Sequence, residues 1–112
     1  MSYIRYKNNN LFVEGVSVRK LASKFSTPFY LYSESSIIDN YKSFLSNFKK
    51  SKPLICFSVK ANSNIQILKV LKKMGSGADV VSGGELLKAI KSGIKPNKIV
   101  FSGVGKTEDE IR

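Results

Sequence analysis

Residues 53–64 read PLICFSVKANSN, and this stretch decides the fold. Pro53 opens an apolar run over residues 54–59 that predicts a buried strand. The polar residues 62–64 follow, and side chains of this kind cap helices. A buried strand that passes directly into a capped helix is typical of α/β proteins with a parallel sheet.

The same strand–helix unit recurs twice downstream. Residues 78–81 predict a second strand. Ser82 and Glu85 after it predict a capping box, in which hydroxyl and carboxylate each bind the other residue's backbone amide. Residues 98–102 predict a third strand, and residues 107–110 predict a second capping box. These repeats favour the first three βα units of a (β/α)8 TIM barrel, and the pattern leaves an open flavodoxin-like sheet as the alternative.

An amphipathic helix precedes these units. Apolar residues recur at steps of three and four over residues 37–48, and Ser33 or Ser35 can cap the first turn. The elements expected before this helix are a strand over residues 11–13, a helix over 17–25 and an aromatic strand over 29–32. We therefore divide the chain into amino-terminal strands, residues 1–32, and the first part of a barrel, residues 33–112.

Three parallel strands do not close a barrel. The third strand, residues 98–102, is predicted to have an unpaired edge, and residues 107–112 hold only the first turn of a capped helix. We therefore expect that most of the barrel is absent and that the chain is the amino-terminal fragment of a longer protein. We also expect the isolated chain to aggregate or to stay partly unfolded.

Composition excludes several classes of site and partner. The chain has 19 basic and 8 acidic residues, but its lysines are scattered without an arginine-rich tract, so we expect no nucleic-acid partner. It has no histidine and one cysteine, Cys56, which excludes a serine–histidine triad and a cysteine–histidine metal site. No apolar run approaches the ~20 residues of a transmembrane helix and no secretory signal is visible, so we expect a cytoplasmic protein without a membrane partner.

Lys60 is the strongest candidate for chemistry. It directly follows the first parallel strand, at the carboxyl end where barrel enzymes place catalytic groups. Strand alternation would turn Cys56, Ser58 and Lys60 toward the barrel axis, away from the covering helices. An amine in a dry site is partly unprotonated, and the unprotonated form attacks carbonyl groups. The alternative, a lysine that reaches solvent from the strand end, is the one that periodicity alone favours.

The pair Gly83-Gly84 is a weaker candidate. Its amides could bind an anion at the start of a helix. The simpler interpretation, which we favour, is that the pair lets the strand turn into the capped helix. The chain contains no GxGxxG or P-loop pattern.

Three segments carry a resemblance to a known family. FSVKANSN at residues 57–64 resembles the lysine segment of the alanine-racemase-like, fold-type III pyridoxal-phosphate enzymes. MGSGADVVSGGEL at 74–86 and KIVFSGVGKTEDEI at 98–111 are similar, at matching spacing, to the diaminopimelate decarboxylase family. The resemblance is continuous from about Phe29 to the end of the chain and looser before it.

The resemblance implies a homodimeric two-domain enzyme. Its barrel binds pyridoxal 5'-phosphate, and the amino-terminal strands lie with a second, β domain. Lys60 would hold the cofactor covalently, and Asp79 would lie near both. The implied reaction is decarboxylation of meso-diaminopimelate to L-lysine, with a small-molecule substrate. The family's phosphate-binding and ring-binding residues would follow Arg112. Another fold-type III enzyme, such as an ornithine or arginine decarboxylase or a racemase, and a non-enzymatic fragment remain alternatives.

Overall fold

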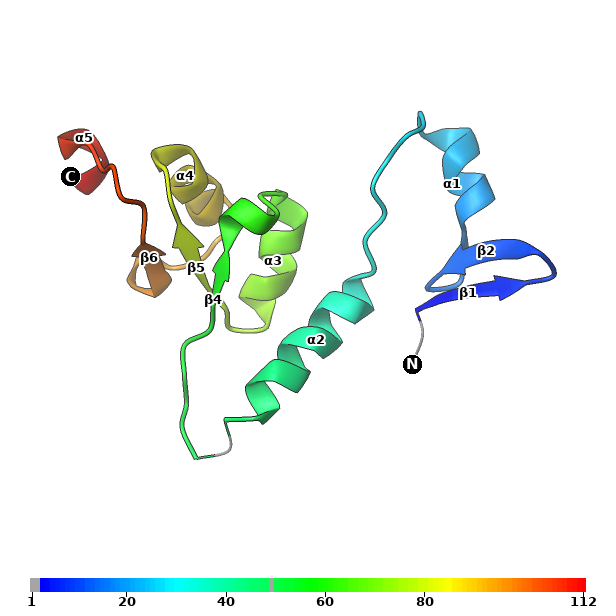
Figure 1. Ribbon diagram of the computed structural model, residues 1–112, viewed down its shortest axis with the longest axis horizontal. Coiled ribbons are helices and arrows are strands. Elements are labelled where there is room, and N and C mark those ends of the chain that lie inside the picture. Colours follow the sequence, from blue (N-terminus) through cyan, green and yellow to red (C-terminus); the bar gives the residue numbers. More distant parts are fainter. Residues whose placement is uncertain (1–2, 49) are drawn as a thin grey trace.

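The computed structural model describes residues 3–48 and 50–112. Its first part is a three-stranded antiparallel sheet in the order β1-β2-β3, followed by α1 (Figure 1). The elements are β1 (Ile4–Lys7), β2 (Asn10–Val13), β3 (Val16–Ser17) and α1 (Val18–Lys24). The predicted strand over residues 11–13 and helix over 17–25 are confirmed. Strand β1 was not predicted, because all four of its residues are exposed and give no burial pattern.

The predicted strand over residues 29–32 is wrong. This segment is extended, but it pairs with no strand among the residues that the structure describes. Tyr30 is 90% exposed and stacks on Tyr32, with ring centroids 6.3 Å apart. Aromatic residues favour a strand only where a neighbouring strand accepts them, and none does here.

The predicted amphipathic helix is α2 (Glu34–Ser46), and Ser33 rather than Ser35 is its cap. The Ser33 hydroxyl accepts a hydrogen bond from the Ser36 backbone amide at 3.0 Å. A carboxylate oxygen of Glu14 accepts hydrogen bonds from the Ser33 hydroxyl and from the Ser35 amide, the latter at 2.8 Å. These contacts hold the turn after β2 against the start of α2.

The second part of the chain is a parallel sheet in the order β4-β5-β6. Its elements are β4 (Cys56–Ser58), η1 (Val59–Ala61), α3 (Ile65–Lys73), β5 (Gly77–Val80), α4 (Gly83–Lys91), η2 (Pro96–Lys98), β6 (Ile99–Phe101) and α5 (Glu108–Ile111). The predicted strand–helix alternation and parallel pairing are confirmed, so the chain is of the α/β class.

The hydrophobic core lies between this sheet and the helices α3 and α4. Its buried members come from both layers: Val59, Leu68, Ala78, Val80, Ala89 and Ile94. Phe57, Ile99 and Phe101 pack against them from the strands. The opposite face of the sheet has no helix on it within the described residues (Figure 1). Alternation along the strands therefore separates an apolar face from a face that carries polar groups.

The first predicted capping box is only half formed. The Ser82 hydroxyl accepts from the Glu85 amide at 3.2 Å as expected, but the Glu85 carboxylate accepts from the Val81 amide at 2.9 Å instead of from Ser82. The Glu85 carboxylate bonds to the Val81 amide, one residue before Ser82, because β5 ends at Val80. The second box, Thr107 with Glu110, is confirmed in both directions. No helix in the described residues is long and apolar enough to cross a membrane.

Candidate active site

A hydrogen-bonded cluster joins the three parallel strands near their carboxyl ends. Asp79 on β5 accepts a hydrogen bond from the Ser102 hydroxyl at 2.5 Å on one carboxylate oxygen. Its other oxygen accepts from the Ser58 hydroxyl at 3.2 Å. Ser58 is the last residue of β4 and is paired in register with Asp79, whereas Ser102 directly follows β6. The carboxylate is therefore held from both neighbouring strands.

Lys60 lies just beyond the same edge of the sheet. Strand β4 ends at Ser58, and Lys60 is the middle residue of the 3-10 turn η1. The strand alternation used to orient Lys60 therefore stops at Ser58. Val59, next to Lys60 in the turn, is fully buried in the core on the helix side of the sheet. Lys60 is exposed, and no residue in the described part of the chain bonds to its amine.

Cys56 is the first residue of β4 and lies on the same polar face of the sheet as Ser58. Its sulfur is 3.9 Å from the Lys98 carbonyl oxygen, and it is opposite Gly77 in the register. Burial, and then the charge of Asp79, raise the pKa of the Cys56 thiol. The thiol is therefore protonated at neutral pH, and it is not a nucleophile of the low-pKa kind.

The glycine pair at the start of α4 already has a carboxylate bound to it. The Gly83 amide donates to a carboxylate oxygen of Glu110 at 2.8 Å. Glu110 comes from the first turn of α5, so the chain supplies its own negative group to the start of α4. This contact agrees with the simpler interpretation of Gly83-Gly84 as the start of a capped helix.

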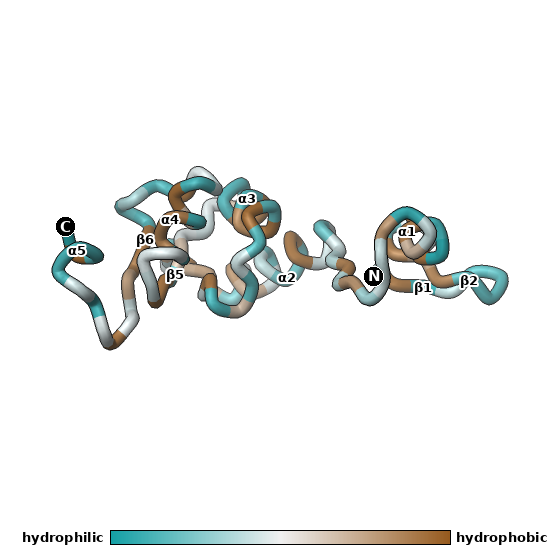
Figure 2. Tube along the Cα trace, turned by 90° about the horizontal axis from the view of Figure 1, so that it is seen from above, coloured by the Kyte–Doolittle hydropathy of each residue, from teal (hydrophilic) through white to brown (hydrophobic). Residues whose placement is uncertain are grey.

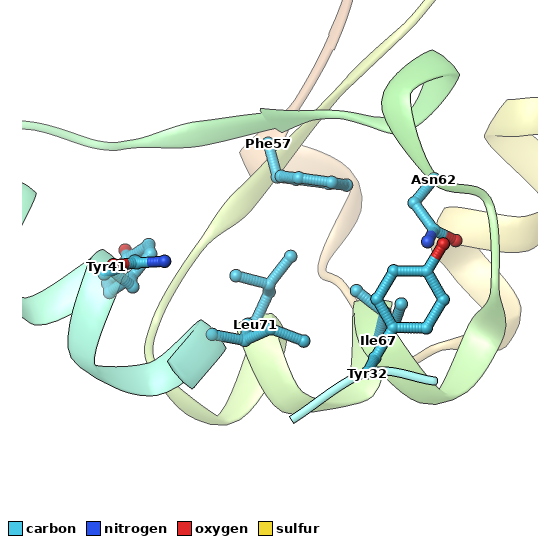
Figure 3. Close-up of a pocket in the computed structure, with 8 residues that line it drawn as sticks. Tyr32, Tyr41, Phe57, Asn62, Ile67 and Leu71 are labelled. Atoms are coloured by element: carbon cyan, nitrogen blue, oxygen red, sulfur yellow. The ribbon is translucent and has the colours of Figure 1, made fainter. Parts of the chain in front are cut away.

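An apolar pocket lies on the other side of β4, away from Asp79. It has a volume of about 320 Å³ and lies between Phe57 of β4, Ile67 and Leu71 of α3, and Tyr41 of α2, with Tyr32 and Asn62 at one end (Figure 3). Burial raises the pKa of Tyr41. The pocket lies between α2, α3 and β4 and contains neither Lys60 nor Asp79.

Sequence reasoning found Lys60 and Asp79 but missed the two serines that bind Asp79. Ser58 was expected on the polar face of the sheet, but its hydrogen-bond partner was not predicted. The contacts could have been anticipated because Ser58 and Ser102 both lie near the carboxyl end of a predicted parallel strand. In the described residues, no group of three or more histidine, cysteine, aspartate or glutamate side chains could hold a metal ion.

Comparison with known proteins identifies the family. The model of the family described as "Pyridoxal-dependent decarboxylase, pyridoxal binding domain" matches residues 34–112, which include Lys60 and the whole parallel sheet. The chain belongs to this family. The resemblance seen in the sequence is thereby confirmed at the level of the pyridoxal-dependent decarboxylases.

Relatives within the family are diaminopimelate decarboxylases. The enzyme of Aquifex aeolicus is 48% identical over 109 residues, which are 97% of this chain and 26% of the relative. The crystal structure of the M. jannaschii enzyme in complex with L-lysine matches with a TM-score of 0.92 at 40% identity, over 98% of this chain and 27% of that one. The Helicobacter pylori enzyme, also complexed with L-lysine, matches 83% of this chain and 24% of that one, with a TM-score of 0.79 at 49% identity. The chain thus spans about a quarter of the length of these decarboxylases.

Proposed function

We propose that Lys60 and Asp79 belong to the active site of a pyridoxal-phosphate-dependent decarboxylase that converts meso-diaminopimelate to L-lysine and CO2. The observation that carries this proposal is the position of an amine and a carboxylate near the carboxyl ends of neighbouring parallel strands. Both lie inside the segment that matches the pyridoxal-binding family. The choice of substrate is supported by the similarity to diaminopimelate decarboxylases along nearly the whole chain.

The donor set on this chain fits pyridoxal phosphate. The aldehyde of the cofactor requires a primary amine, and the Lys60 amine is exposed and has no bonding partner among residues 3–48 and 50–112. A lysine ammonium and a cationic ring both require a negative group nearby. Asp79 provides one that two hydroxyl groups hold in place. We infer that Lys60 binds the cofactor covalently and that Asp79 balances charge beside it.

The overall reaction breaks the bond from the α-carbon to one carboxyl group, releases CO2 and adds a proton to that carbon. Pyridoxal phosphate, when bound, supplies the electron sink for the electron pair left on the carbon. Lys60 would hold the cofactor at the carboxyl edge of the sheet. Asp79 would place a negative charge at the same edge of the sheet, held there by two serine hydroxyl groups.

The proposal extends to the organisation of the protein. We propose that residues 33–112 form the first part of a (β/α)8 barrel and that residues 1–32 lie with a second, β domain of a homodimeric enzyme. The antiparallel pairing of β1-β2-β3, in contrast to the parallel β4-β5-β6 sheet, supports the division. The family match that begins at residue 34 supports the same boundary. Residues 1 and 2 lie outside the described part of the chain.

The test is to locate the cofactor in the complete, cofactor-loaded protein. Borohydride reduction followed by peptide mapping should find the pyridoxyl group on the peptide that contains Lys60. Lys60→Arg keeps the positive charge but cannot form the link, so decarboxylation should fall by orders of magnitude and the label should disappear. Lys69→Arg is the matched control, because Lys69 is exposed on α3, outside the proposed site.

The same assay separates the alternatives. CO2 release from diaminopimelate supports the proposed substrate, whereas release from ornithine or arginine alone would assign a related decarboxylase. A label on another lysine, or a Lys60→Arg variant with normal activity, would overturn the assignment of Lys60.

A further inference from the structure

The Asp79 carboxylate has a partner on each side, and both partners are serine hydroxyl groups. One comes from the end of β4 and the other from the residue after β6. An ionised carboxylate can only accept hydrogen bonds, so both hydroxyls must donate to it. Each carboxylate oxygen receives one of these two bonds.

This arrangement fixes the carboxylate plane. Rotation about the bond between the β-carbon and the carboxylate would break at least one of the two hydrogen bonds. A carboxylate has about four acceptor sites, and the two serines occupy two of them. The remaining sites are free for a donor at the carboxyl edge of the sheet, where Lys60 follows β4.

We propose that Ser58 and Ser102 are positioning residues that hold the Asp79 carboxylate between them, in the orientation that serves Lys60 and the cofactor. This inference rests on the proposed function, since it assigns Asp79 to the same site. The bond from Ser102 is shorter than the bond from Ser58, 2.5 Å against 3.2 Å, so Ser102 contributes more.

The alternative is that the cluster only ties three strands together. Both interpretations predict a loss of stability when a serine is removed, so stability cannot distinguish them. They differ in the energetic coupling to Asp79. A positioning residue has no further effect on turnover once Asp79 is absent, whereas a general loss of sheet stability adds to the effect of losing Asp79.

The experiment is a double-mutant cycle in the complete, cofactor-loaded protein. Ser58→Ala, Ser102→Ala and Asp79→Ala are made as single variants. Each serine variant is then combined with Asp79→Ala to give two double variants. We expect kcat to fall about threefold for Ser58→Ala and about tenfold or more for Ser102→Ala, with KM nearly unchanged. The circular dichroism of the bound cofactor should change in both single variants. In the Asp79→Ala background neither serine should alter kcat or the dichroism.

Two further variants separate the hydroxyl from the shape of the side chain. Threonine and valine have nearly the same shape and both suit strands, so Ser102→Thr should keep most of the activity and Ser102→Val should lose it.

Ser76→Ala is the matched control. Its hydroxyl donates to a backbone group, the Ile55 carbonyl oxygen, at 3.0 Å. Ser76 lies at the amino end of β5, whereas Asp79 lies near the carboxyl end of that strand. It should leave the cofactor dichroism unchanged.

The outcomes keep the inference separate from the proposed function. If the wild-type protein takes up no cofactor or releases no CO2, the proposed function fails and the inference fails with it. If the wild-type protein is active, additive effects in the cycle or equal activity of Ser102→Thr and Ser102→Val would overturn the inference alone.

Discussion

At the scale of single residues, Glu110 shows how one carboxylate can serve two helices. One of its oxygens accepts from the Thr107 amide at 3.0 Å, which closes the capping box of α5. The other accepts from the Gly83 amide at the start of α4. These backbone bonds, the one from Thr107 first, lower the pKa of the Glu110 carboxyl group. Its charge therefore connects two consecutive βα units.

This contact predicts an acid-sensitive contribution to stability. The pKa of Glu110 is lower in the folded state, so its stabilisation is present above the ordinary carboxyl range and is lost as the pH falls through the folded-state pKa. Glu110→Gln should lower the thermal unfolding midpoint of the complete protein at neutral pH. The difference from wild type should shrink as the pH is lowered from about 7 to about 4 or below.

Glu108→Gln is the control for this measurement. Glu108 lies in the same turn of α5, but its side chain is 79% exposed and pairs only with Arg112 at the surface. It should change the midpoint much less, because exposed ion pairs contribute little. A Glu110→Gln difference that stays constant with pH would show that the carboxylate charge is not what connects the two helices.

At the scale of elements, Gly77 at the start of β5 has no room for a side chain. A Cβ atom at this position would lie 2.2 Å from the Lys98 carbonyl oxygen and 2.9 Å from the Cys56 sulfur. Both distances are far below contact distance, and the nearer atom is backbone. The sheet can therefore keep its register at the start of β5 only if residue 77 has no side chain.

A pair of glycine substitutions tests this packing. Gly77→Ala should destabilise the complete protein by about 1–3 kcal/mol, because the strands must move apart to make room for the methyl group. Gly84→Ala is the matched control in α4, where the nearest atom to the new Cβ is the Ser82 hydroxyl at 3.9 Å. It should stabilise by about 0.5–1 kcal/mol, as alanine does in a helix. Equal midpoints of thermal unfolding for the two variants would contradict the close approach.

At the scale of the whole molecule, the chain is extended. Its radius of gyration is 17.1 Å, whereas a compact domain of this length has a radius of about 13 Å. Seen from above, the antiparallel part and the parallel part lie at opposite ends, with α2 between them (Figure 2). Large apolar side chains are exposed on α2, on the segment before β4 and on the sheet, among them Phe44, Leu54 and Val100. Exposed apolar surface of this kind favours association.

This shape predicts the behaviour of the 112-residue chain by itself. At micromolar concentration we expect association in analytical ultracentrifugation and a broad thermal transition, because exposed apolar faces and unpaired strand edges favour aggregation. The complete protein, measured in parallel, should give a defined species and a sharper transition. A monomeric 112-residue chain with a cooperative transition would contradict this prediction.

Local signals determined the helices and the order of the elements. Apolar residues at helical spacing predicted α2, and capping residues predicted the starts of α3 and α4. The caps Ser33 and Asn64 lie where the sequence expected them. Caps bind amides two or three residues away, so a short stretch of sequence contains both partners. The alternation of strands and helices predicted the parallel sheet for the same reason, since each βα unit is local.

Only the tertiary structure decided the contacts between units. Residues 29–32 have the composition of a strand but pair with no strand among the described residues. The bonds of Asp79 to Ser58 and Ser102 join residues more than twenty positions apart, as does the bond of Glu110 to Gly83. Such contacts depend on how strands align side by side, and the register is set by packing against α3 and α4, which no local pattern encodes. The sequence therefore named Lys60 and, through the family resemblance, Asp79 as candidates, and the fold decided which side chains hold Asp79 in place.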